Sequence, residues 1–358
     1  NNFFENQEYF WGVAEKLTRA LLAPVSLIFV AFFLDLKSQG YLYTFISLIS
    51  ARHLLELGLI QIVITFISYE KNYLRIDSGV LKGKLLNYKR FKEISIYSFK
   101  YFFISSLIYF LILIAIGFIV FYNEGESFSF WFYPYILLIT LTGIDLIVMP
   151  IYAIKEGLSD LKQVYKFKFF KAILSIIAFI VLMYLNLGIW SFSLSLICSL
   201  MIDIYFISIN FNILKILFKR SKKKLNVFNW IKEIIPVQLK TAIGTISGFL
   251  SFSLITPFTF SFLGAETAGR VGLTIAVLAG ISGLATLPTL ISVHKISTLV
   301  ERKNIDEINK LLIKLTSFIV IVFISFLIFS YFIFSFLKIY YPELLFRVLE
   351  PKLFLIYL

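Results

Sequence analysis

Long apolar segments alternate with short polar ones along the whole chain. About 20 apolar residues span the hydrocarbon core of a bilayer as a helix, and nine segments reach that length. They are predicted at 12–34, 43–69, 97–121, 132–154, 171–187, 189–214, 234–258, 270–293 and 315–337, and a tenth begins at 352. Because an open sheet cannot satisfy its backbone groups in lipid, all are expected to be helices. The pattern therefore predicts an all-α integral membrane protein.

Composition agrees with this class and excludes others. The chain is 59% hydrophobic with a mean hydropathy of +0.88, above the range of soluble domains. Its net charge of +13 lies mainly between the spans, so it does not indicate a nucleic-acid partner. Two histidines, one cysteine and no phosphate-binding glycine loop give no catalytic, metal or nucleotide site. We expect neither an enzyme nor a cofactor.

Lysine and arginine are concentrated in alternate connecting segments. The segments 70–92, 155–171, 215–232 and 294–314 carry 24 of the 34 basic residues. Basic loops stay on the cytoplasmic side of a membrane. These four segments and the N-terminus are therefore predicted to be cytoplasmic, with the acidic loop 122–131 outside.

The sequence repeats weakly at an offset of about 229 residues. Phe33-Leu34 followed by Gly40 leads into the second span, and Phe262-Leu263 followed by Gly269 leads into the eighth. This predicts two halves of six spans in the same orientation, related by an axis along the membrane normal. The halves are a six-helix lobe at 1–218, a basic cytoplasmic linker at 219–231 and a second lobe at 232–358. The second lobe is expected to be incomplete in this chain.

Ionisable residues inside the spans are the candidates for a site, because charge in lipid is costly and faces a bundle interior or a watery cavity. Lys16, Arg19, Arg52 and Lys240 place four cations on the first, second and seventh spans. If these spans meet between the halves, the cations form one basic chamber that suits phosphate or pyrophosphate.

Other polar residues allow further interpretations. His53, Glu56, Gln238 and Arg270 are the remaining candidates for contact with a substrate. Asp145 and Asp203 could bind a coupling H⁺ or Na⁺, or pair with a nearby lysine.

Local neutralisation remains the alternative for two of the cations. Arg19 stands four residues from Glu15, and Arg52 stands four residues from Glu56, a spacing that permits ion pairs within one helix. Lys240 has no acid at helical spacing.

Several short motifs resemble a known family. They are Gln39-Gly40-Tyr41-Leu42-Tyr43-Thr44-Phe45, Glu56-Leu57-Gly58, Glu156-Gly157, Gln238-x-Lys240 and Gly269-x-x-Gly272-Leu273. With them the chain resembles, over essentially its whole length, the polysaccharide-biosynthesis or O-antigen flippases of the multidrug/oligosaccharidyl-lipid/polysaccharide exporter superfamily. The resemblance implies a MATE-like fold of two six-helix lobes in the bacterial cytoplasmic membrane.

The resemblance also implies a function. The protein would move an isoprenoid-pyrophosphate-linked oligosaccharide across the membrane by alternating access, among membrane lipids and other glycan-assembly proteins. One alternative is a MATE-like exporter of drugs or metabolites, whose cationic substrates would favour an acidic cavity. Another is a membrane-embedded polymerase or acyltransferase of glycan assembly, for which His53 is the one candidate catalytic residue.

Overall fold

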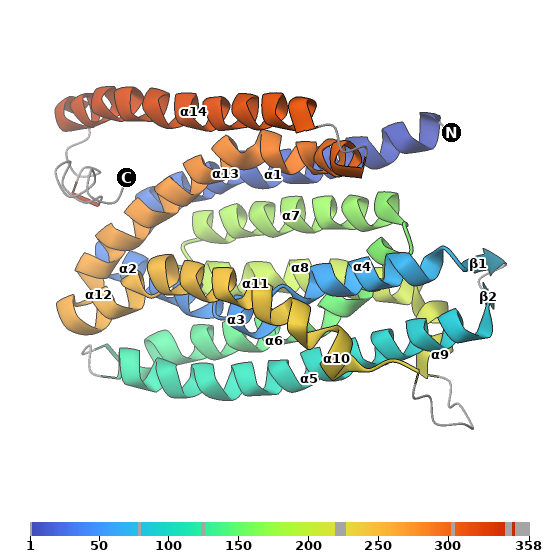
Figure 1. Cartoon of the computed structure of the whole chain (residues 1–358). Helices are drawn as coiled ribbons and strands as arrows, with labels where there is room; N and C mark the ends of the chain where they lie inside the picture. The colour runs from blue at the N-terminus through green and yellow to red at the C-terminus, as the bar shows by residue number, and fades with distance from the viewer. Residues whose placement is uncertain are drawn as a thin grey trace.

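A computed structural model describes residues 2–77, 80–122, 126–218, 227–301, 305–340 and 346–347. Within these ranges the chain forms an elongated bundle of helices, with one short β hairpin at one end (Figure 1). The elements in chain order are α1 (Asn2–Phe33), α2 (Leu36–Ile49), α3 (Arg52–Glu56), α4 (Leu59–Lys71), β1 (Leu74–Asp77), β2 (Val80–Gly83), α5 (Leu85–Phe121), α6 (Phe128–Gly157), α7 (Leu161–Tyr184), α8 (Trp190–Ile209), α9 (Phe211–Phe218), α10 (Trp230–Glu233), α11 (Ile235–Gly248), the π-helical turn η1 (Phe249–Ser253), α12 (Ile255–Leu263), α13 (Ala265–Glu301) and α14 (Ile305–Tyr340).

Nine helical segments of the described chain are long and apolar enough to span a membrane. They correspond one to one with the nine predicted spans, so the chain is an all-α multi-pass membrane protein, as predicted. The predicted tenth span and most of the linker 219–231 lie outside the described residues.

The third span is longer than predicted. The apolar pattern placed its start at 97, whereas α5 begins at Leu85. Charged residues fill the added turns, so the hydropathy of these turns is too low for them to be assigned to a span from the sequence. They find partners there: Arg90 bonds Glu70 at 2.8 Å and Glu233 at 2.6 Å.

Glu233 lies outside the spans, and this contact favours its charged form. Burial opposes its ionisation, but the Arg90 guanidinium and the Asn229 backbone N–H outweigh burial and lower the pKa of Glu233. The result is an ionic contact between α5 of the first half and α10, which leads into the second.

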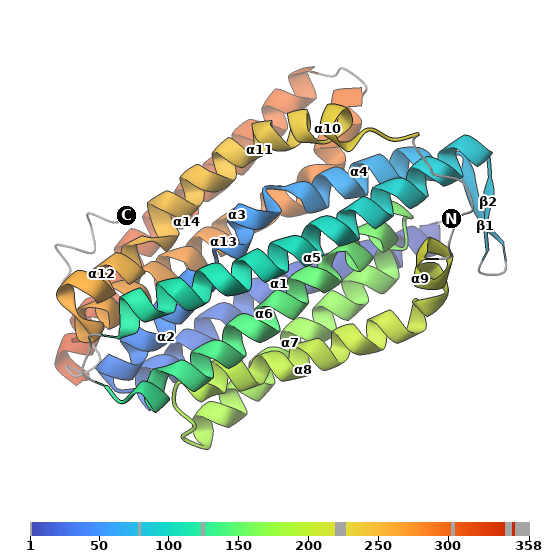
Figure 2. The same ribbon diagram turned by 90° about the horizontal axis from the view of Figure 1, so that it is seen from below.

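The described parts of the four basic segments all lie at one end of the bundle. Strands β1 and β2, the α6–α7 turn, α9, α10 and the adjoining ends of α13 and α14 gather there with the start of α1, and Figures 1 and 2 agree on this placement. The α5–α6 connection lies at the opposite end, where Glu126 pairs with Lys37 at 2.7 Å. The described parts of the basic segments therefore share one end of the bundle, and the side of the membrane that they face stays a prediction.

Labelling would test this sidedness. In a Cys198→Ala background, single cysteines at the exposed residues Lys84 and Lys232 should react with a membrane-impermeant maleimide from the cytoplasmic side only. A cysteine at Tyr122, 72% exposed at the other end, should react from outside only. If Tyr122→Cys and Lys84→Cys react from the same side, this topology is wrong.

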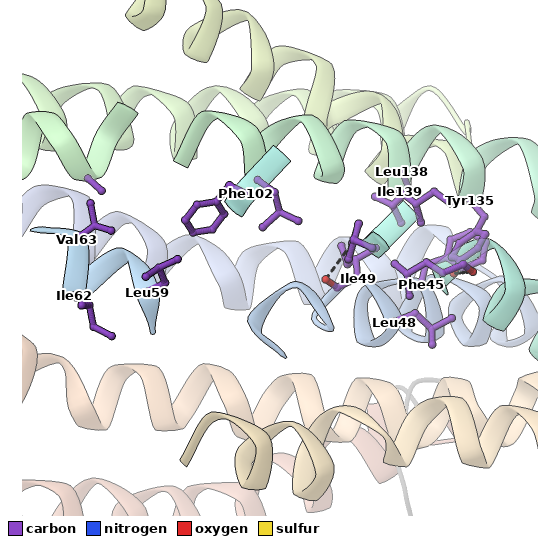
Figure 3. Packing of buried hydrophobic residues seen from close by; sticks show 14 of the residues in the cluster. Phe45, Leu48, Ile49, Leu59, Ile62, Val63, Phe102, Tyr135, Leu138 and Ile139 are labelled. Carbon is purple, nitrogen blue, oxygen red and sulfur yellow. Dashed lines mark hydrogen bonds between the residues drawn. The ribbon is translucent and has the colours of Figure 1, made fainter. Parts of the chain in front are cut away.

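The largest hydrophobic cluster holds the second, third and fourth spans together. Phe45 and Ile49 of α2 pack near Tyr135 of α6, and Leu59 of α4 packs near Phe102 of α5 (Figure 3). Between these two groups the helix of the second span is interrupted (Figure 3). Apolar packing thus fixes both ends of the span and leaves its charged centre as a separate segment.

Two glycines allow α2 and α13 to touch backbone to backbone. A Cβ on Gly40 would overlap the carbonyl of Ala265, and a Cβ on Gly269 would lie 2.6 Å from the carbonyl oxygen of Leu36. Adding 229 to Leu36 and Gly40 gives Ala265 and Gly269. The two contacts are therefore one contact repeated with the helices exchanged.

A third contact lies about one turn further along both helices. A Cβ on Gly272 would overlap Tyr43, and these positions also differ by 229. Such a reciprocal register is what a two-fold axis between two parallel helices produces. The helices flanking this pair follow it, since α1 contacts α13 while α12 contacts α2.

Candidate functional site

The second span is broken at its charged centre. Helix α2 ends at Ile49, α4 begins at Leu59, and between them Leu57 and Gly58 have left-handed φ angles of 45° and 72°. Glycine adopts this conformation freely, whereas leucine does so only when its surroundings impose it. Interrupted helices frequently form sites in transporters, because the break presents backbone and side chains inside the membrane. The continuous helix predicted at 43–69 is corrected on this point.

Side chains from neighbouring spans satisfy the carbonyls that the break sets free. Tyr109 on α5 donates to the Ile49 carbonyl at 3.2 Å, and Tyr101, also on α5, donates to Leu55 at 2.6 Å. From the second half, Thr241 on α11 donates to Leu57 at 2.8 Å. Non-helical backbone is tolerated at membrane depth only with such partners.

A four-residue ion cluster lies beside the break. Asp145 on α6 accepts from Lys171 on α7 at 2.5 Å and from Arg52 at 3.3 Å. The same Lys171 reaches Asp203 on α8 at 2.7 Å, and Tyr152 donates to Asp203 at 2.8 Å. Asp203 is fully buried. Two cations and two carboxylates balance, which is how charge persists in a low-dielectric interior.

This cluster corrects the pairing predicted from spacing. Arg52 bonds Asp145 instead of Glu56, because the short α3 turns its side chain towards α6, and Glu56 lies 3.7 Å from His53. Both aspartates pair with a lysine, as one interpretation held, and that lysine is Lys171.

Lys171 was missed as a site residue because the sequence argument counted it with the basic segment 155–171. The helix begins ten residues earlier, at Leu161, so Lys171 lies well inside α7. One signal could have found it. The apolar run 172–183 is shorter than the ~20 residues that span a bilayer as a helix, so its helix had to continue back past Lys171.

A cavity of about 510 Å³ lies beside this cluster, within the first six spans. Its charged lining residues are Arg19, Arg52, Glu56, Asp145, Lys168 and Lys171. All of them come from the first 209 residues. The cavity is therefore a chamber of mixed charge inside the first half, and not a basic chamber between the halves.

A second cavity, of about 600 Å³, does lie between the halves. It is enclosed by α1 and α2 on one side and by η1, α12 and α13 on the other. Among its lining residues the charged ones are Lys16 and Arg19, and the others are apolar, small or hydroxylic, including Tyr43, Thr256 and Gly283. This cavity has basic groups and an otherwise largely apolar wall.

Arg19 lines both cavities, and its pairing with Glu15 is confirmed. The Nε atom lies 2.5 Å from Glu15, whose carboxylate is buried, while the Arg19 side chain stays 58% exposed. The guanidinium is thus neutralised on one edge and accessible on another.

The single four-cation chamber is not formed. Arg52 lines the first cavity and Lys16 the second, whereas Lys240 is exposed on α11 and lines neither. Gln238 is buried two residues away, on another face of the same helix, and donates to Tyr101 at 3.2 Å. Arg270 also lines neither cavity; its Nε atom is enclosed without a hydrogen-bond partner in the described structure.

Comparison with known proteins gives no match: no protein-family model, no curated protein and no solved structure matches the chain.

Proposed function

We propose that this protein is a flippase that moves an isoprenoid-pyrophosphate-linked oligosaccharide across the bacterial cytoplasmic membrane. The observation that carries the proposal is the cavity between the halves, whose wall combines Lys16 and Arg19 with apolar and small side chains. A ligand with an anionic headgroup and a long hydrocarbon chain would match both parts of this wall: the headgroup would contact the cations and the chain would contact the apolar side chains.

The two cations are placed for a phosphate ligand. Lys16 and Arg19 lie three residues apart, so they share one face of α1. Arginine binds two phosphate oxygens at once, and the exposed edge of Arg19 leaves room for this beside Glu15. The isoprenoid would follow the apolar wall towards lipid while the sugars occupy the wider, wetter part of the path.

Transport requires two halves that move, and the reciprocal contact of α2 with α13 supports that architecture. A two-fold relation between the second and eighth spans fits a MATE-like fold with six-helix lobes, working by alternating access. In this proposal the basic end faces the cytoplasm, where the lipid-linked glycan is assembled by partner enzymes.

The mixed-charge chamber gives the second candidate function its support. Asp145 and Glu56 line a chamber of about 510 Å³, and carboxylates would suit a cationic drug or metabolite. Asp145 already pairs with Arg52 and Lys171, and Glu56 lies 3.7 Å from the His53 imidazole. We therefore assign this chamber to ion coupling by Asp145 and Asp203, with H⁺ or Na⁺, and rank the exporter second.

Removal of Arg19 tests the function. Arg19→Gln should lower translocation of a fluorescent isoprenoid-pyrophosphate-linked oligosaccharide in proteoliposomes by at least about tenfold, since a hydrogen bond to a charged group contributes ~1.5–3 kcal/mol. Lys166→Gln is the matched control, because Lys166 is exposed beside Trp11 and lines neither cavity.

A paired variant separates binding from neutralisation. If Arg19 serves only to neutralise Glu15, then Glu15→Gln with Arg19→Gln should restore transport. If Arg19 binds substrate, the double variant should stay inactive at normal membrane levels. Efflux of the cationic dye ethidium without any glycan-lipid translocation would establish the exporter instead.

A further inference from the structure

Helix α11, the first spanning helix of the second half, packs against the broken second span of the first half. In the described structure it lies against α3 and α4, the two helices that flank the break in the second span. Gln238 and Ala242 are its buried residues, while Leu239 and Ile243 are exposed. Residues 238, 241 and 242 form one stripe on the helix surface, at the spacing that places side chains on a shared face.

This stripe holds the left-handed turn of the break. The Thr241 hydroxyl lies within hydrogen-bonding distance of the Leu57 carbonyl, at 2.8 Å, and of the Gln238 carbonyl of its own helix, at 2.9 Å, and a Cβ on Gly58 would lie 3.0 Å from the same hydroxyl oxygen. Gln238 donates to the Tyr101 hydroxyl at 3.2 Å, and Tyr101 donates to the Leu55 carbonyl at 2.6 Å. Two of the carbonyls at the break are therefore held directly or indirectly from the second half.

The strained conformation needs these partners. A left-handed leucine persists only where its surroundings impose it, and Leu57 directly follows the five-residue α3. Because α3 has no buried residue of its own, its position depends on the contacts at its ends. Arg52 begins this short helix and reaches Asp145 at 3.3 Å.

We propose that Thr241, together with the Gln238–Tyr101 pair, positions Arg52 and ties its contact with Asp145 to the movement of the second half. The inference rests on the proposed function in that the halves move during transport. When α11 shifts against the first half, the Leu55 and Leu57 carbonyls must follow or lose their donors. The charge cluster of the first half thereby senses the state of the second.

A purely structural hydroxyl makes a different prediction. It would stabilise the break in every state, and its loss would loosen the break equally whether or not the halves can move. A positioning residue instead couples the break to the position of α11. If α11 is held in place by a cross-link near one end, hydrogen exchange at the break should change when Thr241 is present and should not change when it is absent.

The constraint can be imposed without any substrate. Tyr97 on α5 and Trp230 on α10 have ring centroids 5.9 Å apart at the basic end, and α10 leads directly into α11. In a Cys198→Ala background, Tyr97→Cys and Trp230→Cys can be joined by a short bismaleimide. Hydrogen–deuterium exchange of the peptide 53–61 is then measured in nanodiscs with and without the cross-link.

Joining should slow exchange of this peptide about fivefold when Thr241 is present, the effect expected for one stabilised hydrogen bond. With Thr241→Val the response should fall below about twofold, and Thr241→Ser, which keeps the hydroxyl, should restore it. Thr245→Val is the matched control: Thr245 lies one turn further along α11 and bonds only the Thr241 carbonyl of its own helix, at 3.2 Å, in the described structure.

The proposal is overturned if Thr241→Val responds to joining as fully as Thr245→Val, or if joining leaves exchange unchanged in the protein with Thr241. Faster basal exchange with an intact response would show a structural hydroxyl and would also overturn it. No substrate enters this measurement, so a wrong substrate class would appear in the Arg19 experiment and not here.

Discussion

Replacing Lys171 by methionine is expected to destabilise the folded protein by about 3–5 kcal/mol, the usual effect of removing one partner from a buried ion pair. Lys171 lies 2.5 Å from Asp145 and 2.7 Å from Asp203, and Asp203 is fully buried. Without the ammonium group, two carboxylates would face each other with only Arg52 to neutralise them. The effect is measured as the midpoint of thermal unfolding in detergent, with the folded fraction at each temperature determined by size-exclusion chromatography.

A second substitution should reverse most of this loss. Lys171→Met with Asp203→Asn leaves one cation, Arg52, and one carboxylate, Asp145, so the cluster is neutral again. The asparagine oxygen can still accept from Tyr152. Lys166→Met is the control, since Lys166 is exposed on the same helix, where it lies over the Trp11 ring, and its loss should cost only ~0–1 kcal/mol. A double variant as unstable as Lys171→Met alone would contradict the role of charge balance.

Hydropathy was sufficient for the spans and insufficient for their interruptions. Nine apolar segments could be predicted because lipid requires both length and apolar character, and these are properties of the sequence alone. The break at Leu57 could not, since apolar residues continue through it and the left-handed turn depends on donors from Tyr101 and Thr241. Gly58 was its one local signal.

The candidate site was predicted in its parts and not in its grouping. Arg52, Asp145 and Asp203 were singled out because charge inside a span needs a reason, and the structure brings these three together through Lys171. Their grouping depends on helix rotation and on which spans are neighbours, and neither is encoded in local spacing. Lys240 shows the same limit, because the rotation of α11 turns it away from both cavities.

The contact of α2 with α13 gives the second large effect. Gly40→Ala should destabilise the protein by at least ~1–3 kcal/mol, because the added methyl group would overlap the backbone carbonyl of Ala265, which cannot rotate away as a side chain could. Gly269→Ala should have a similar effect through the reciprocal contact with the Leu36 carbonyl. Because both substitutions strain one interface, the double variant should depart from additivity.

The expected loss of stability is opposite in sign to the usual effect of a glycine-to-alanine substitution in a helix. Replacing a glycine by alanine inside a helix normally favours the helix, by up to about 1 kcal/mol. Gly244 on α11 is the matched control, since nothing would lie within 4 Å of its Cβ, and Gly244→Ala should raise the unfolding midpoint or leave it unchanged. Gly40→Ala and Gly269→Ala should both lower it, since each methyl group would meet a backbone carbonyl, and Gly40→Ala should lower it more because its overlap is closer. If both are as stable as Gly244→Ala, the helices do not meet at this distance, and the strongest structural support for two equivalent halves is lost.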